Sequence, residues 1–239
     1  MNSGANMNSS TFDFATWQMR IQLQVGAFEE MDKMVTDPEL RDKHLDKSYP
    51  RPKLSRAPQG IFTGSELLRL ATEGSISSAH GVYLRQMIVV IATLLETICF
   101  DHLELLFVAK PDCMIGYTHN GGDMKFTGLV HLREILVHTK ERLLITLAAR
   151  ASKRIVDLPH AKRFKKIEEL SNQQIPAELR GQLMEIVELR NKIVHENNQD
   201  EVGQHQLYTY FKCLEDFLIW CAHRLEELNV PVRWDNRVE

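Results

Sequence analysis

The sequence predicts an all-α protein: an antiparallel four-helix bundle with an N-terminal helical extension and a small β-hairpin insertion. Three observations support this fold class. Apolar residues recur at intervals of three and four over several long stretches, which is typical of amphipathic helices. Glycine and proline are sparse inside those stretches and gather between them. The apolar fraction of 44% and the charged fraction of 26% are typical of chains that bury a core.

Residues 1–78 are expected to form the N-terminal helical extension and a proline-containing linker. An amphipathic helix is predicted from Phe14 to about Asp37, where proline follows. Its apolar positions have a heptad-like spacing: Trp17, Ile21, Phe28, Met31 and Val35. Such a face needs a partner surface, either the rest of the chain or a second copy. The charged stretch 39–59 contains three prolines and is expected to be a linker, and a short helix is predicted after Thr63.

Residues 79–239 are expected to form the bundle. Its four helices are predicted over residues 83–109, 129–151, 178–194 and 203–228. The first is almost continuously apolar and is therefore expected to be buried, and the last has an unbroken three-four alternation. Asn120-Gly121-Gly122 predicts a β-hairpin over residues 113–126, because an Asn-Gly pair supplies the positive φ angles of a tight turn.

The charge, the apolar runs and the cysteine positions of the sequence argue against several classes of protein. A net charge of −3 argues against a chain that binds nucleic acid over its whole surface, although a basic run over residues 150–166 could follow phosphates or be a solvated face. No apolar run reaches the roughly 18 uncharged residues of a membrane helix. The first ten residues lack the apolar segment of a secretory signal, and the four cysteines are scattered. We expect a cytoplasmic protein with no membrane partner, no metal and no cofactor.

One predicted helix carries residues that break its apolar pattern. Arg190 follows Ile186 by four residues and Val187 by three, so it lies on the face that should be buried. A guanidinium cannot lose its charge and must there be paired, hydrogen-bonded or open to a cleft. Asn191 follows directly, and His195 stands where the helix ends and a polar turn begins. Alternatively, Arg190 pairs with a buried acid and His195 only caps the helix.

The string from Leu189 to Glu196 resembles the signature of the HEPN superfamily, named for higher eukaryotes and prokaryotes nucleotide-binding. That signature is an arginine, a polar residue, three further residues and a histidine, here Arg190, Asn191 and His195. Members are helical bundles, and many are ribonucleases. The resemblance covers residues 78–228 in expected architecture but only six residues in motif.

The resemblance implies a metal-independent endoribonuclease, in which a ribose 2′-hydroxyl attacks the adjacent phosphate and leaves a 2′,3′-cyclic phosphate. His195 would transfer protons, Arg190 would stabilise the charge that builds up on the phosphate, and Asn191 would orient the backbone or phosphate. The superfamily's dimers form one composite site from two motifs. This suits residues five apart, which lie about 140° apart around a helix. Members serve as toxins or anti-phage defence effectors, sometimes with an inhibitor or antitoxin protein.

RNA, for instance a tRNA, is the expected partner, and four further residues are candidates for contacting it. Lys192 lies inside the motif, and the hairpin is expected at the same end of the bundle as His195. These candidates are Lys192, Lys110, His119 and Lys125. Two other hypotheses stay open: a non-catalytic bundle that binds a partner or a nucleotide, and a structural protein that dimerises through the face beginning at Phe14.

Overall fold

A computed structural model describes residues 11–48, 64–114, 117, 138–196 and 202–235. Over these residues the chain is mostly helical and forms no strand, so the all-α class is confirmed for this part. The α-helices are α1 (Phe14–Thr36), α2 (Pro38–Ser48), α3 (Gly64–Ala109), α6 (Lys140–Val156), α7 (His160–Ser171), α8 (Ala177–His195) and α9 (Gln204–Glu227), and a 3-10 helix, η1, spans Pro111–Met114. An isolated bridge pairs Phe12 with Val232 near the two termini.

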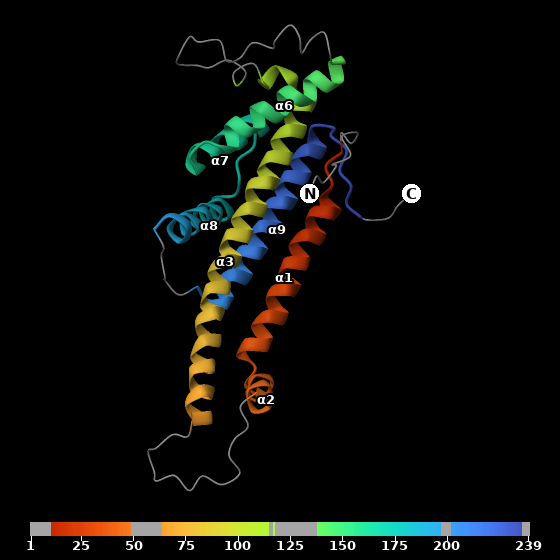
Figure 1. Ribbon diagram of the computed structural model, residues 1–239. Helices are drawn as coiled ribbons and strands as arrows, with labels where there is room; N and C mark the ends of the chain where they lie inside the picture. The colour runs from red at the N-terminus through yellow and green to blue at the C-terminus, as the bar shows by residue number, and fades with distance from the viewer. Residues whose placement is uncertain (1–10, 49–63, 115–116, 118–137, 197–201, 236–239) are drawn as a thin grey trace.

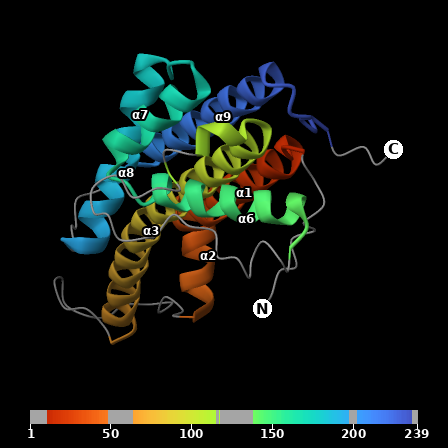
Figure 2. The ribbon, with the colours of Figure 1, turned by 90° about the horizontal axis from the view of Figure 1, so that it is seen from above.

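Helix α3, with 46 residues, is the axis of the molecule. Helix α1 runs antiparallel to it along one side, whereas α9 runs in the same direction as α3 (Figure 1). Helix α6 crosses the C-terminal end of α3, as the view from above also shows (Figure 2). The described helices therefore do not confirm the antiparallel four-helix bundle, whose first and last members would be α3 and α9. The reason is α7, an additional helix that adds a change of chain direction between α6 and α8.

One apolar core joins α1, α3, α6, α7, α8 and α9. Helix α9 contributes the predicted three-four stripe, of which Leu207, Phe211, Leu214, Leu218, Cys221 and Leu225 are all buried. The apolar face of α1 is buried in the same core through Phe14, Trp17, Ile21 and Phe28. The expected partner surface of α1 is therefore the rest of the chain. The expected domain boundary at residue 78 falls within α3, which is helical without interruption there.

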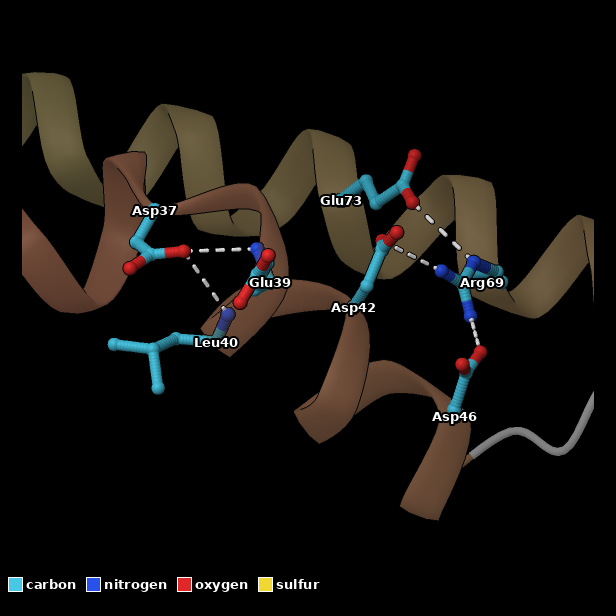
Figure 3. A network of polar contacts seen from close by, with 7 residues as sticks. All are labelled: Asp37, Glu39, Leu40, Asp42, Asp46, Arg69 and Glu73. Carbon is cyan, nitrogen blue, oxygen red and sulfur yellow. Dashed lines mark hydrogen bonds and ion pairs between the residues drawn. The ribbon is translucent and has the colours of Figure 1, made fainter.

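Several local predictions differ from the structure. Part of the expected linker is α2, which begins at Pro38; proline is favourable in the first turn of a helix, where its missing N–H is not needed. The backbone N–H groups of Glu39 and Leu40 donate to Asp37 Oδ1 at 2.8 and 3.2 Å, which caps this helix (Figure 3). The two helices predicted after Thr63 and from Tyr83 are one continuous helix, α3.

In the part of the chain that the structure describes, the second bundle helix begins and ends later than predicted, since α6 continues to Val156 and not only to residue 151. It begins at Lys140, after Thr139, whose hydroxyl accepts a hydrogen bond from the Arg142 N–H at 3.3 Å. Residues 129–137 of the prediction lie outside the described residues. The same holds for most of the predicted hairpin; of its described residues, Cys113 and Met114 belong to η1 and Tyr117 is helical.

The length and composition of helix α3 raise the question whether it could cross a membrane. Over Glu66–Ala109 it is long and apolar enough to cross a membrane by length and composition alone, and 44% of its most apolar window is buried inside the molecule. Buried core helices share this length and composition. Ile88, Ile91 and Leu95 of α3 are fully buried in the common core.

Candidate functional site

The HEPN-like motif lies in the C-terminal half of α8, a helix whose predicted bounds are confirmed to within one residue. Leu179, Leu183, Ile186 and Val187 are its buried residues and fix it in the common core. The backbone N–H of Glu196 donates to the carbonyl of Lys192 at 3.0 Å, so the hydrogen-bonded ladder of α8 continues to its last residue, His195. The helix does not fray before the motif histidine.

Arg190 and Asn191 are both half-buried, and they contact each other directly. Arg190 Nη1 donates to Asn191 Oδ1 at 3.1 Å. Within the described ranges, Arg190 forms no ion pair with a carboxylate, so the alternative of a buried Arg–acid pair gains no support there. A hydrogen bond to an amide oxygen orients a guanidinium but leaves its positive charge uncompensated.

His195 and Lys192 lie at the exposed end of α8. Val194 between them is 46% exposed, so no apolar layer of the described chain covers this end of the helix. Because α8 stays regular through His195, Arg190 and His195 point in directions about 140° apart. One phosphate therefore does not reach both side chains of the same chain without a change in the helix end.

The structure does not bring the remaining predicted contact residues to the motif. Lys110 is half-buried and directly follows the C-terminal end of α3. That end of α3 and the C-terminal end of α8 lie apart in both views (Figures 1 and 2). Their expected proximity required an up-down bundle, which the additional helix α7 prevents. His119 and Lys125 lie outside the described residues.

The basic run over residues 150–166 is divided between internal and exposed positions. Arg163 is buried, and its Nη1 lies 3.3 Å from Glu96 Oε1 on α3. Arg154 Nη1 donates to the carbonyl of Tyr117 at 2.5 Å. Both arginines thus contact other parts of the chain, so the alternative of a solvated face does not describe these two residues. Lys162 and Lys165 are exposed on α7 and remain candidates for contact with an anionic partner.

Two histidine contacts join residues far apart in sequence, and no sequence pattern predicts either of them. His80 Nε2 lies 2.9 Å from Asp32 Oδ1, which also accepts a hydrogen bond from Gln204 Nε2 at 2.5 Å. His102 is fully buried, and its Nε2 lies 3.1 Å from Ser171 Oγ. Burial lowers the pKa of His102 to about 4, because the charged imidazolium loses its hydration there. His102 is thus neutral inside the fold at neutral pH.

The clearest groove lies at the opposite end of α8 from His195. It has a volume of about 720 Å³ and is lined by Pro176 and Leu179 of α8 and by Tyr208, Cys213 and Trp220 of α9. No group of three or more histidine, cysteine, aspartate or glutamate side chains is arranged to hold a metal ion in the part of the chain that the structure describes. The motif therefore lies on an exposed helix end and not in this groove.

No protein-family model matches the chain, and no curated protein and no solved structure matches it. What the chain does must therefore be argued from its own residues.

Proposed function

We propose that the chain is a HEPN-type, metal-independent endoribonuclease. In this reaction a ribose 2′-hydroxyl attacks the adjacent phosphorus, the P–O5′ bond breaks, and the products are a 2′,3′-cyclic phosphate and a 5′-hydroxyl end. His195 takes the proton of the 2′-hydroxyl or returns one to the leaving 5′-oxygen, since an imidazole can do both near neutral pH. Arg190 stabilises the negative charge that builds up on the phosphate oxygens.

The observation that carries this proposal is the Arg190–Asn191 hydrogen bond beside an exposed histidine. The 3.1 Å bond orients a half-buried guanidinium without neutralising it, which leaves its charge for a phosphate. Lys192 is exposed between these residues and His195 and is positioned to contact the RNA backbone.

The proposed active unit is a homodimer with a composite site. Because α8 is regular through His195, Arg190 of one chain and His195 of a second chain would act on one phosphate more readily than the two residues of a single chain. The substrate class is RNA, for instance tRNA. The proposed setting is the cytoplasm, with a role as a toxin or anti-phage defence effector that an inhibitor or antitoxin protein restrains. The alternative is a non-catalytic helical protein that binds a partner or a nucleotide.

The test is incubation of the purified full chain with total RNA in excess EDTA, followed by mapping of fragment ends. Wild type is expected to cleave and to leave 2′,3′-cyclic phosphates, and His195→Ala is expected to lower the rate by about a hundredfold or more, since a positioned acid–base group contributes that much. The matched control is His223→Ala, because His223 is an exposed histidine on α9, with 63% of its side chain accessible. Equal cleavage by wild type and His195→Ala would refute the assignment, and cleavage by neither would favour the binding protein.

A further inference from the structure

Helix α1 has a second apolar face that the fold leaves uncovered. Leu23 and Met34 are each 62% exposed and Met19 is 48% exposed, although α1 already buries a full apolar face in the core. In Figure 1, α1 forms the outer edge of the group made by α3, α9 and α1, on the side away from α8. No other described helix packs on this outer face.

The exposed residues follow the three-four spacing of a helix that pairs with another helix. The outer-face set is Arg20, Leu23, Ala27, Glu30 and Met34, and all five are exposed. On an ideal helix their centre lies about 130° from the centre of the buried face. A stripe of this spacing on solvent-facing surface indicates an interaction surface, because isolated exposed apolar residues have no such period.

We propose that this outer face of α1 pairs antiparallel with the same face of a second copy of the chain. Four of the five residues are symmetric about Val25: Arg20 and Glu30 lie five residues to either side, and Leu23 and Ala27 lie two residues to either side. In an antiparallel pair centred there, each Arg20 lies beside Glu30 of the other chain, and each Leu23 packs on Ala27. A twofold axis makes each contact twice.

The charges on the outer face of α1 favour a second copy of the chain as the partner, and they favour an antiparallel pair. A parallel pair would place Arg20 against Arg20 and Glu30 against Glu30, which like-charge repulsion disfavours. A lipid surface would gain nothing from the carboxylate of Glu30 within the stripe. Two single helices bury less area than the roughly 1,200 Å² of a standard stable interface, so the pair is expected to form at high chain concentration and to dissociate on dilution.

This contact is independent of the proposed ribonuclease site, since α8 lies on the other side of α3 (Figure 1). If the rest of the chain is monomeric, pairing through α1 gives a dimer. If a composite-site dimer also forms, each dimer presents two α1 faces, and pairing through them gives a tetramer or a growing chain. In both cases a variant in which this face is disabled is expected to lose the concentration-dependent gain in mass. The outcome of the α1 experiment and the outcome of the RNA assay can thus be separated.

The experiment is sedimentation velocity of the full chain over a concentration series, with charge reversal on α1. Arg20→Glu and Glu30→Arg are each expected to raise the dissociation constant about tenfold or more, because each turns two attractive contacts into two repulsive ones. The double variant Arg20→Glu/Glu30→Arg restores both contacts and is expected to associate like wild type. A mixture of the two single variants is expected to form the mixed pair.

The controls separate association from folding. Arg20 stacks on the Trp17 ring at 4.7 Å, and its charge also acts on Asp101 of α3, so Arg20→Glu is checked by circular dichroism, and Glu30→Arg supplies a variant without these contacts. Lys33→Glu reverses an exposed charge of α1 away from the outer face and is expected to leave association unchanged. Wild type that shows no association at several hundred micromolar, or association that neither single reversal weakens, would overturn the proposal. The proposal would also be overturned if neither the double variant nor the mixture of the single variants restored association.

Discussion

The two ends of the α1–α3 pair are held together by different kinds of contact. At the end where α1 begins, residues 12–14 contact residues 232–234: Phe12 and Val232 form a bridge, and the Phe14 and Trp234 rings lie 4.6 Å apart. At the other end, which we call the arm (α2 and residues 64–83 of α3), Leu45 is the one buried residue of α2. No described residue of α3 before Leu84 is buried.

Polar contacts take the place of the core in the arm. Arg69 of α3 pairs with Asp42 at 2.7 Å, with Asp46, and with Glu73 at 3.4 Å, and it thereby ties α2 to α3 (Figure 3). The Arg69 side chain is 12% exposed, but the three carboxylates that it contacts are 35–48% exposed, and ion pairs with such partners contribute less to stability than buried apolar area. The comparison indicates that the core around α3 and α9 sets the global stability, and that the arm can open without unfolding the rest.

The largest effect is expected from removing a core side chain. Phe217 is fully buried, stacked on Trp220 at 5.9 Å and edge-on to Phe164 at 6.2 Å. Phe217→Ala should lower the free energy of unfolding by about 3–5 kcal/mol, because it leaves a cavity where α9 contacts Phe164 of α7. Denaturant titration measures this, and a loss below about 1 kcal/mol would contradict the assignment of stability to this core.

The second-largest expected effect is a dependence of the free energy of unfolding on pH, which is caused by a histidine in the core. The pKa of the buried His102 is lowered to about 4, so below the ordinary value of 6.5 the unfolded chain takes up a proton that the folded chain excludes. Stability should therefore fall as the pH drops from about 6.5 to about 4, by roughly 3 kcal/mol in total at about 1.4 kcal/mol per tenfold difference in proton affinity. His102→Gln should flatten this decline, and an unchanged slope in that variant would show that other groups cause it.

A smaller and local effect is expected in the arm from Leu45→Ala. Leu45 is fully buried but lies outside the common core. The substitution should cost about 2 kcal/mol, the lower end for buried leucines, and should release α2 without releasing α9. Hydrogen exchange tests this, since the amides of α2 should exchange faster while those of α9 keep their protection. Equal acceleration in both helices would mean that the arm and the core unfold together.

The smallest effect is expected from Arg69→Met, which removes the charge and keeps most of the stem. Exchange in α2 should rise, and the midpoint of global unfolding should stay where it is, because the ion pairs of Arg69 join α2 to a part of α3 that lies outside the common core. A clear fall in the global midpoint would show that the arm is part of the cooperative core. Lys153→Met, at an exposed ion pair on α6, is the matched control.

The helices α8 and α9 were predictable because local chemistry delimits them. Pro176 and Gly203 stand at their N-caps, and their apolar stripes have the helical period. Helices α2 and α7 were not predicted, because their sequences are highly charged and each depends on long-range partners. Arg163 of α7, for example, pairs with Glu96, which lies 67 residues away. The direction of α9 relative to α3 likewise follows from packing that no local pattern records.

For the candidate site, the sequence could predict only that residues of one helix lie near one another. Arg190, Asn191, Lys192 and His195 are neighbours on α8, as their spacing requires. The expected proximity of Lys110 depended on the order of helices in space and is not found. The contact of His80 with Asp32, 48 residues away, has no counterpart in any sequence pattern.

The most direct test of a composite ribonuclease site is complementation between two inactive variants. Arg190→Ala and His195→Ala are each expected to be silent alone in the metal-free RNA assay. When the two variants are unfolded, mixed and refolded together, half of the dimers contain one chain of each variant. Each of these dimers has one intact site out of two, so about a quarter of the wild-type rate should return. Active wild type with a silent mixture of folded variants would contradict a site shared between chains.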